Sequence, residues 1–353
     1  MRIALALLLA LLASPAAAQA PSPTLTRIAF GSCADEEKPQ PIWDAVMAYR
    51  PQLFLFAGDN VYGDVSGGRG VEAGREIEAL AESYRLAAQV PGLKALRERV
   101  PHLATWDDHD YGLNDAGASF AGKEAAKALF LDFWHAPADD PRRGREGVYH
   151  AQMFGPPGRR VQVILLDTRS FRSDLKPTDR RGAVGRERYL PDEDPAKTML
   201  GEAQWAWLAE RLREPAELRL VVSSIQVLAL GHGWESWSNL PRERRRLLDL
   251  VGDTGAAGVV FLSGDRHIGA LYEEREGVPY RLVEITSSGL TESFPGNREP
   301  GPNRLGAVWG ETNFGTLDID WWEGSIALSL RSENGEVVRR ETLDLRALRP
   351  GAP

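Results

Sequence analysis

The feature that most constrains the fold is a series of short apolar runs that alternate with segments of helical periodicity. Short apolar runs between turn residues are typical of buried strands, whereas apolar residues at helical spacing are typical of helices. The strand-like runs are 27–30, 53–56, 103–106, 161–166, 220–222 and 259–262. The helix-like patterns are 42–49, 77–88, 125–134, 205–212 and 247–251. Their alternation predicts an α/β fold.

The last part of the chain follows a different pattern. Residues 315–320, 325–330 and 337–343 alternate apolar and polar side chains, and the sequence ENGE at 333–336 supplies an Asn-Gly hairpin turn. Antiparallel strands after α/β units predict a four-layer α/β/β/α sandwich, with two mixed β-sheets packed face to face and helices outside. The chain has no internal repeat and no Pro/Ser-rich linker, so we expect residues 21–353 to form a single domain.

The first twenty residues predict an exported protein. They contain one basic residue, an apolar core and small residues before a cleavage site, which is the pattern of a secretory signal peptide. No Arg-Arg pair is present, so we expect the Sec route and a periplasmic or secreted location. No later run is long enough to span a membrane. Removal of 1–20 takes away Arg2 alone, which changes the net charge from −8 to −9 and argues against nucleic-acid binding.

Polar clusters follow four of the predicted strands. They are GSC at 31–33, AGDNVY at 57–62, DDHDYGLND at 107–115 and SGDRH at 263–267. The carboxyl ends of strands in an α/β sheet meet at one edge, so these clusters predict one site. Carboxylates and phenolate suit trivalent or alkaline-earth ions, whereas imidazole and thiolate suit transition metals. We therefore expect two adjacent cations, bridged by Asp59, with Tyr62 reaching one of them; such a pair can activate water for phosphoryl transfer.

Cys33 is the only cysteine and cannot form an internal disulfide. A lone cysteine is a buried apolar thiol, a metal ligand or a nucleophile that works with a histidine. The cysteine count leaves all three roles open, and the four companion motifs favour the ligand.

Five segments in order between residues 28 and 268 carry a family resemblance. They are FGSC, AGDNVYGD, TWDDHDYGLND, LLDTRSF and LSGDRH. They resemble the signature series of the PhoD-like phosphatases (alkaline phosphatase D), relatives of the purple acid phosphatases among the calcineurin-like metallophosphoesterases. The resemblance implies Fe³⁺ and one or two Ca²⁺ ions. The implied ligands are Cys33, Asp59, Tyr62 and His267 for iron, and Asp108 and Asp265, with Asp59 bridging, for calcium.

The resemblance also implies roles around the metals. His109 would hydrogen-bond the phosphate and protonate the leaving alkoxide, and Asn114 would contact the phosphate. Gln226 falls where purple acid phosphatases have a further histidine ligand, so we expect it near the metals. Asp110 stands where the family usually has Glu. The family's usual N-terminal extra domain is expected to be absent, and its members commonly use the twin-arginine route instead of Sec.

Three further segments have open roles. Asp167 either is structural, in a salt bridge for which Arg169 is a candidate partner, or has a direct role in the site, and we expect the structural role. His232 lies in the Gly- and Trp-rich segment 231–239, which either contacts substrate or packs. Residues 170–200 hold a series of basic side chains that either recruits an anionic substrate or forms a solvated loop.

The sequence therefore predicts an exported metal-dependent phosphoesterase that hydrolyses phosphate monoesters, diesters or both with a metal-activated hydroxide. Its substrate would be a phosphate ester of a small molecule, a phospholipid or a polymer. One alternative is an exported metalloprotein that binds phosphate or a phosphorylated polymer without turnover. Another is a Cys-His hydrolase that uses Cys33 directly.

Overall fold

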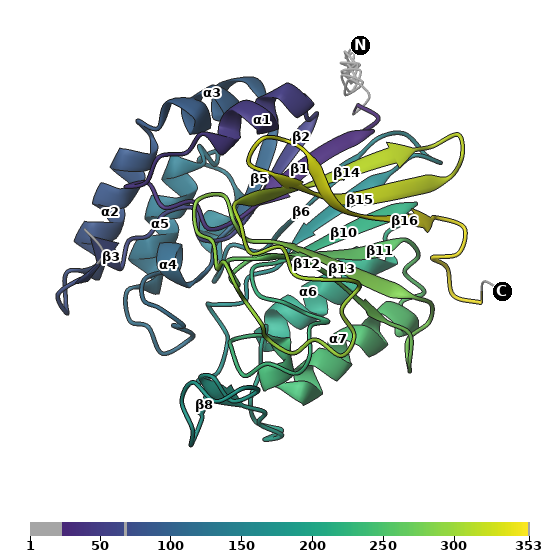
Figure 1. Cartoon of the computed structure of the whole chain (residues 1–353). Coiled ribbons are helices and arrows are strands. Elements are labelled where there is room, and N and C mark those ends of the chain that lie inside the picture. The colour runs from purple at the N-terminus through teal and green to yellow at the C-terminus, as the bar shows by residue number, and fades with distance from the viewer. Residues whose placement is uncertain (1–22, 67–68, 352–353) are drawn as a thin grey trace, which may run out of the picture.

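One sheet of the sandwich contains the first strands of the chain and the last. The computed structural model describes residues 23–66 and 69–351, and its first six-stranded sheet has the order β16-β15-β14-β1-β2-β5 (Figure 1). β1, β2 and β5 are parallel, and β14, β15 and β16 form the predicted antiparallel end. The strands are β1 (Arg27–Gly31), β2 (Leu53–Ala57), β5 (His102–Thr105), β14 (Asn313–Asp320), β15 (Ser325–Ser332) and β16 (Val337–Asp344).

The second sheet has the order β12-β13-β11-β10-β7-β6. Its four central strands are parallel, and β6 and β12 are antiparallel edges. The strands are β6 (His150–Phe154), β7 (Val161–Leu165), β10 (Leu218–Ser223), β11 (Val259–Ser263), β12 (Gly269–Glu274) and β13 (Leu282–Ser287). Two hairpins stand apart: β3 (Val65–Ser66) with β4 (Arg69–Gly70), and β8 (Lys176–Pro177) with β9 (Tyr189–Leu190).

Helices cover both outer faces, as Figure 1 shows. The first sheet carries α1 (Ile42–Tyr49), α2 (Glu76–Ala87), α3 (Pro91–Arg99), α4 (Asp108–Tyr111) and α5 (Lys123–Phe133). The second carries α6 (Gly201–Arg213) and α7 (Pro241–Asp253), and short 3₁₀ turns lie at η1 (Pro141–Gly144) and η2 (Trp237–Asn239). The predicted four-layer α/β/β/α sandwich is confirmed. The predicted signal peptide, residues 1–20, lies outside the described residues.

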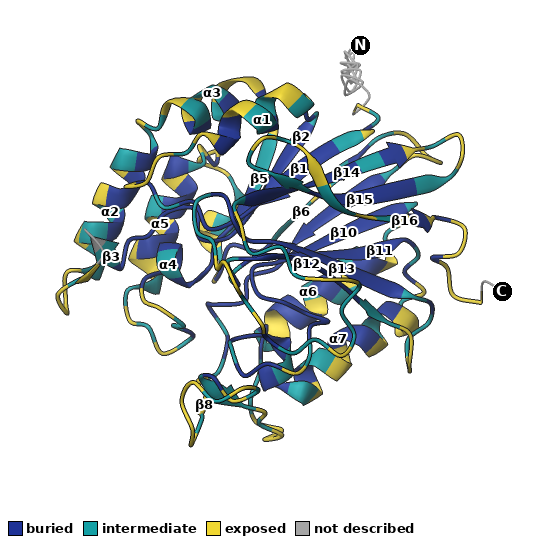
Figure 2. Cartoon of the chain, in the orientation of Figure 1, coloured by how far each residue is buried: buried dark blue, intermediate teal, exposed yellow. Residues whose placement is uncertain are grey.

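The strands alternate between two cores. On β1 and β2, Phe30 and Leu55 pack in the cluster shared with the second sheet, whereas Phe54 and Phe56 pack with the helices. Successive strand side chains point to opposite faces, so a strand with helices on one side and a sheet on the other is apolar throughout. Figure 2 shows the strands of both sheets largely buried. In the part of the chain that the structure describes, no helix combines the length and the apolar character needed to cross a membrane.

Candidate metal centre

The polar loops meet at the edge where parallel strands of both sheets end. Cys33 follows β1, Asp59 follows β2, Asp108 follows β5 and Asp265 follows β11. Parallel strands place their carboxyl ends at the same edge of a sheet. Because the two sheets are stacked, the loop after β11 of the second sheet reaches the loops after β1 and β2 of the first, as the 3.2 Å contact between the Tyr62 hydroxyl and Nε2 of His267 shows.

Two glycines allow these loops to approach closely. A Cβ on Gly58, whose φ is +103°, would lie 2.6 Å from the Cβ of Asp107. A Cβ on Gly264 would lie 2.4 Å from Oγ of Ser32. Glycine is required at both positions because it has no Cβ. The glycines of the two Gly-Asp pairs thus allow four loops to approach one another, and the next residue in each pair is a predicted ligand, Asp59 or Asp265.

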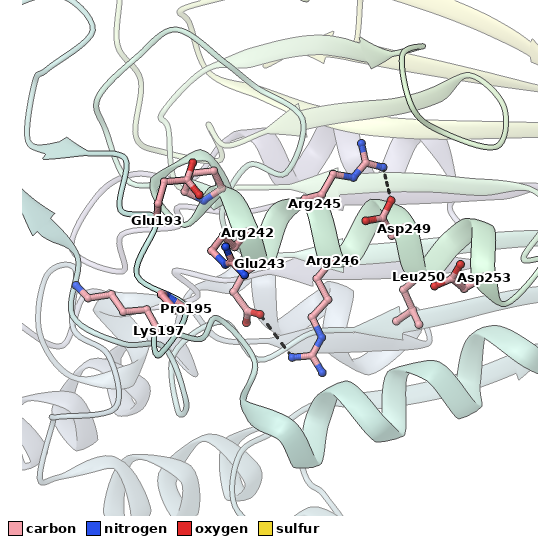
Figure 3. A pocket seen from close by; sticks show the side chains of 11 residues that line it. Glu193, Pro195, Lys197, Arg242, Glu243, Arg245, Arg246, Asp249, Leu250 and Asp253 are labelled. Carbon is pink, nitrogen blue, oxygen red and sulfur yellow. Dashed lines mark ion pairs between the residues drawn. The ribbon is translucent and has the colours of Figure 1, made fainter.

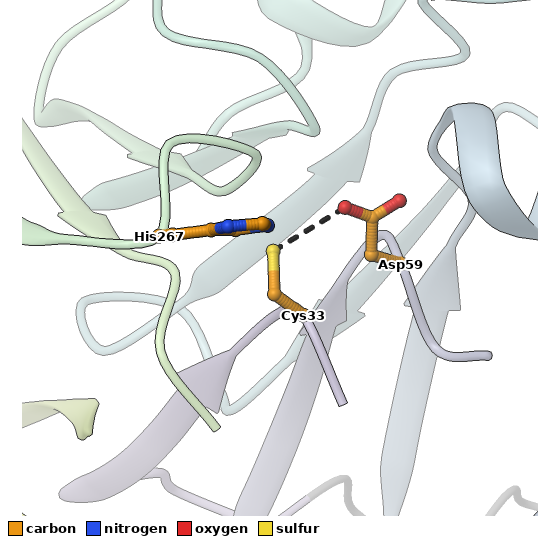
Figure 4. Close-up of side chains that lie close together, drawn as sticks. All are labelled: Cys33, Asp59 and His267. Carbon is orange, nitrogen blue, oxygen red and sulfur yellow. Dashed lines mark hydrogen bonds between the residues drawn. The ribbon is translucent and has the colours of Figure 1, made fainter. Parts of the chain in front are cut away.

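Cys33, Asp59 and His267 point toward one another in Figure 4. One sulfur, one carboxylate oxygen and one ring nitrogen of these residues lie within 4.8 Å of one another. The Cys33 thiol donates to Oδ2 of Asp59 at 3.3 Å, and the Tyr62 hydroxyl lies 3.2 Å from Nε2 of His267. The structure therefore brings together all four side chains predicted to hold iron, and thiolate with imidazole suits a transition metal.

Two carboxylates are shared between neighbouring groups of side chains. Atoms of Asp59, Asp108 and His109 lie within 4.8 Å of one another, and so do atoms of Asp107, Asp108 and Asp265. Asp59 is therefore shared by the Cys33–Asp59–His267 group and the Asp59–Asp108–His109 group. Asp108 is shared by the latter group and the Asp107–Asp108–Asp265 group. All six predicted ligands are thus connected, and Asp59, the predicted bridging ligand, is shared by two of the groups. Asp107 is not among the predicted ligands; it directly precedes Asp108 in the chain, and the fold brings it beside Asp265.

The donor set fits bound cations. Oδ1 of Asp108 and Oδ2 of Asp107 are buried and have no hydrogen-bond partner among the described residues. Burial raises the pKa of Asp59, with a further contribution from Cys33, and burial with Asp107 raises the pKa of Asp265. Buried carboxylates that crowd in this way destabilise a protein unless a positive charge pairs with them. Two cations would supply that charge.

Four of the six predicted ligands have left-handed backbone conformations. The φ angles are 64° at Cys33, 48° at Asp59, 68° at Asp265 and 56° at His267. A residue other than glycine seldom adopts such angles, and each costs on the order of 1–3 kcal/mol. Strain of this kind concentrated in one spot is typical of a functional site, since the surrounding fold must hold it in place.

The protonation of two ligands is set by burial. Burial raises the pKa of the Cys33 thiol to about 12, whereas burial and the adjacent Arg266 lower the pKa of His267 to about 3. His267 is therefore neutral, the form that binds metals. Cys33 would lose its proton when a metal binds, because the thiolate is the ligand. A nucleophilic cysteine is partly exposed and has a lowered pKa, so the geometry argues against direct catalysis by the fully buried Cys33.

Asp64 joins the two residues predicted to be catalytic. Its Oδ1 lies 2.5 Å from Nδ1 of His109, and its Oδ2 accepts from the backbone N–H of Asn114 at 2.8 Å. The bond at Nδ1 leaves Nε2 as the ring nitrogen available to a ligand. The His109 ring stacks on the Tyr62 ring, with their centroids 4.2 Å apart. Although burial opposes it, Asp108 and Asp64 raise the pKa of His109 to about 10. The sequence contains Asp64 in the quoted motif but gives it no role.

Ser288, just beyond β13, connects two of the predicted ligands. Its Oγ accepts from the backbone N–H of His267 at 2.7 Å and lies 3.1 Å from Sγ of Cys33. Because the serine oxygen accepts from His267, its own hydrogen is free to point to the sulfur. Partners of this kind orient metal ligands and tune the metal.

A buried arginine lies behind the carboxylates. Arg169, whose side chain is fully buried, pairs with Asp107, and its Nη1 lies 2.8 Å from Oε2 of Glu235. The predicted ion pair of Asp167 with Arg169 is wrong. Asp167 accepts instead from backbone N–H groups, among them those of Arg169 and Ser170 at 2.9 Å each. The Arg169 guanidinium instead supplies the counter-charge for the buried carboxylates of Asp107 and Glu235.

Three other residues have packing roles. The side chain of Asp110 accepts from the backbone N–H of Asp107 and from Asn60, and so completes a capping box at the start of α4. Gln226 donates to Tyr272 and Thr286 and bonds His232 at 3.0 Å. His232 is buried beside Gln226 and does not line the cavity that opens onto the cluster, described next.

A cavity of about 300 Å³ opens onto the cluster. We call it the metal-centre cavity, and its walls are Asp108, His109, Asn114, Asp115, Arg188, Trp234, Glu235, Asp265, Arg266, His267, Ser293 and Phe294. A larger cavity of about 800 Å³, the α7 cavity, lies between α7 and residues 193–197 (Figure 3). None of its lining residues belongs to the cluster.

The fold and the cluster together define a class. Two mixed sheets between helix layers, with thiol, carboxylate and imidazole groups at their common edge, are the architecture of metallophosphoesterases. The structure superposes on a solved structure of PhoD with a TM-score of 0.69 and 18% identity, over 94% of this chain and 73% of that chain. It also superposes on a purple acid phosphatase from yellow lupin (Lupinus luteus) seeds, with a TM-score of 0.60 and 11% identity, over 92% and 55% of the two chains.

The family is narrower than the class. The model of the PhoD-like phosphatase family matches residues 28–308, and the chain belongs to that family. It is similar to alkaline phosphatase D of Bacillus subtilis (strain 168), with 24% identity over 233 residues. That alignment covers 60% of this chain and 39% of the relative's length.

Proposed function

We propose that the protein is a metal-dependent phosphoesterase that hydrolyses phosphate monoesters, diesters or both. The observation that carries the proposal is the pair of shared carboxylates, Asp59 and Asp108, which link the sulfur, nitrogen and oxygen donors into two adjacent cation positions. Family membership supports the same reaction class.

The ligands of the first cation would be Cys33, Asp59, Tyr62 and His267, and this set suits Fe³⁺. The hard oxygens of Asp59, Asp108 and Asp265 suit Ca²⁺, with Asp107 adjacent. A bound cation pair supplies an activated water and neutralises negative charge on the phosphoryl group.

The protein's own groups complete the site. Asp64 holds the His109 ring through Nδ1, so Nε2 donates to a phosphate oxygen or to the leaving alkoxide. Asn114, whose backbone is fixed by the same carboxylate, presents its side chain to the cavity. The cavity holds the phosphate group while the rest of the substrate extends toward solvent.

Metal analysis and turnover test the proposal together. Purified protein should contain iron and calcium by elemental analysis and should release nitrophenol from p-nitrophenyl phosphate, bis-p-nitrophenyl phosphate or both. Chelation should abolish turnover, and readdition of the two metals should restore it. Phosphate binding with bound metals but no turnover would favour the non-catalytic alternative. Loss of turnover with iodoacetamide but not with chelators would favour the Cys-His hydrolase.

A tyrosinate bound to Fe³⁺ should give a visible charge-transfer band. Tyr62→Phe should remove or shift the band. Tyr84→Phe is the matched control, because Tyr84 is also buried, its hydroxyl has no hydrogen-bond partner among the described residues, and it is not in the cluster. An unchanged band in Tyr62→Phe would exclude Tyr62 as a ligand.

We also propose that the protein is exported, because residues 1–20 have the pattern of a Sec signal peptide. Cell fractionation followed by N-terminal sequencing should find a chain that begins near residue 21 in the periplasm or medium. An intact N-terminus in the cytoplasmic fraction would contradict this.

A further inference from the structure

The structure divides the basic residues of the segment 170–200 into separate groups. They are Arg172, Lys176, Arg180, Arg181, Arg186 and Arg188. Arg172 is buried against Glu235, and Arg186 pairs with Asp179. Arg181 and Arg188 line a cavity, which the other four do not. The basic residues of this segment therefore do not act as one continuous basic surface.

This cavity adjoins the metal centre. It has a volume of about 390 Å³ and lies beside the β8–β9 hairpin, and we call it the hairpin cavity. Its walls are Asn114, Asp115, Pro177, Arg181, Arg188 and Tyr189. Asn114, Asp115 and Arg188 also line the metal-centre cavity. A ligand held at the metals can therefore extend past these shared residues into the second space.

Asp115 fixes the boundary between the two cavities. Its backbone N–H donates to Oδ2 of Asp108 at 2.6 Å, which ties it to a predicted metal ligand. Its Oδ2 accepts from Nη1 of Arg188 at 2.7 Å and from the Tyr189 hydroxyl at 2.6 Å. The Arg188 guanidinium also lies 5.2 Å from the ring of Trp234. These contacts hold Arg188 in place before any ligand arrives.

The two arginines have donors to spare. A guanidinium has five N–H donors, and among the described residues the one hydrogen-bond acceptor found for the Arg188 side chain is Asp115. Arg181 is exposed and forms no ion pair with any described residue. Guanidinium groups bind carboxylates and phosphates through paired hydrogen bonds. A fixed arginine and an unpaired arginine on one cavity therefore suit an anion.

We propose that the hairpin cavity is a subsite for a second anionic group, a carboxylate or phosphate, carried by the alcohol portion of the ester. This inference rests on the proposed function, since it places the reacting phosphate in the metal-centre cavity. It narrows the substrate class to esters that carry a further negative charge at a distance from the phosphate.

Binding of non-hydrolysable ligands tests the subsite without relying on turnover. The probes are ω-carboxyalkyl phosphonates with tethers of increasing length, each compared with the ω-carbamoyl compound of the same length, which has nearly the same shape but no charge. Calorimetry on the metal-loaded protein should show that the carboxylate compound binds about tenfold more tightly at the best tether length. Arg181→Gln should reduce this preference toward one, and Arg180→Gln is the matched control with the same loss of charge on a neighbouring, exposed residue.

The outcomes separate the two proposals. A carboxylate preference that disappears in Arg181→Gln and persists in Arg180→Gln supports the subsite. No preference at any tether length, or an equal loss in both variants, overturns it. The corresponding phosphates report on turnover: if neither phosphate is hydrolysed while the carboxylate preference is present, the proposed function fails and the subsite stands.

Discussion

The α7 cavity and the metal-centre cavity differ in chemistry as well as in size. The α7 cavity is the larger of the two, and its buried carboxylate, Glu243, is satisfied within the protein. Arg245 and Asp249 pair on its surface, and buried Glu243 accepts from Trp205, Met199 and Thr198. In the smaller metal-centre cavity, oxygens of Asp107 and Asp108 lack hydrogen-bond partners among the described residues.

Backbone conformation separates the two regions in the same way. Residues with positive φ include four predicted ligands around the metal-centre cavity, and no residue lining the α7 cavity is among them. Helix α7 is regular and begins with Pro241 at its first position. Unpaired buried charge and backbone strain, and not volume, therefore identify the chemical site.

The largest contrast should come from the bridging carboxylate. Asp59→Asn removes a ligand from both proposed cation positions, so phosphoesterase activity should fall by more than the roughly 10- to 100-fold typical of an outer partner. Bound metal should fall in parallel. Asp249→Asn, in the α7 cavity, is the control and should leave both unchanged. Full metal content and activity in Asp59→Asn would contradict the assignment of the metal-centre cavity, and not the α7 cavity, as the chemical site.

Charge removal should affect stability very differently in the two regions. Arg169→Met leaves Asp107 buried without its counter-charge and Glu235 with Arg172 as its remaining partner, which should lower the free energy of unfolding by about 3–5 kcal/mol in the metal-free protein. Arg245→Met breaks an exposed pair and should cost less than about 1 kcal/mol. Denaturant titration of both variants measures the difference. Equal effects would show that the Arg169 network is no more important than a surface pair.

The buried His232 should also make the stability of the protein depend on pH. Burial lowers the pKa of His232 to about 4, whereas an unfolded histidine titrates near about 6.5. His232 binds a proton less well in the folded protein than in the unfolded chain. Its contribution to the free energy of unfolding is therefore complete above pH about 6.5 and is lost as the pH falls toward about 4. It should reach about 3 kcal/mol.

His232→Gln should therefore have a flatter stability curve than the wild type over that pH window. The exposed His135→Gln should retain the wild-type slope. Free energies of unfolding measured at several pH values test whether His232 causes this pH dependence. Parallel curves for the wild type and His232→Gln would show that it does not.

The smallest expected effect concerns Ser288. Ser288→Ala removes a hydrogen bond to Cys33 and the acceptor for the His267 backbone, so metal affinity should fall by about 10- to 100-fold. The charge-transfer band of the iron-loaded protein should also shift. Ser329→Ala, a buried serine of β15 whose hydroxyl has no partner among the described residues, should leave the band unchanged. An unshifted band in Ser288→Ala would reduce Ser288 to a packing residue.

Much of the fold follows from local pattern, and the exceptions have physical causes. The apolar runs at 53–56 and 259–262 became β2 and β11 because buried parallel strands need no polar face. Strand β13 was missed because Glu284 interrupts it. That glutamate is fully buried, and its carboxylate accepts from the backbone N–H groups of Val227, Leu228 and Ala229. Its partners lie far away in the chain.

The same distinction applies to the site. The motifs predict Cys33, Asp59, Tyr62, Asp108, Asp265 and His267 as one group, and the structure brings these residues together. Asp107, Asp64 and Ser288 were not assigned roles, because each acts through a contact with a residue from another loop. Of the basic residues in 170–200, pattern alone could not separate the buried Arg172 from the cavity-lining Arg181.

The sequence by itself determined many of the strands and helices and their alternation, the residue types at the ends of four strands and thus the kind of chemistry available. These are local properties, since periodicity and turn residues act over a few positions. The tertiary structure alone decided which carboxylates are shared between neighbouring groups of possible metal ligands, which arginine is buried as a counter-charge and which faces a cavity. Those outcomes depend on distances between loops of two different sheets, and the packing of the sheets sets these distances.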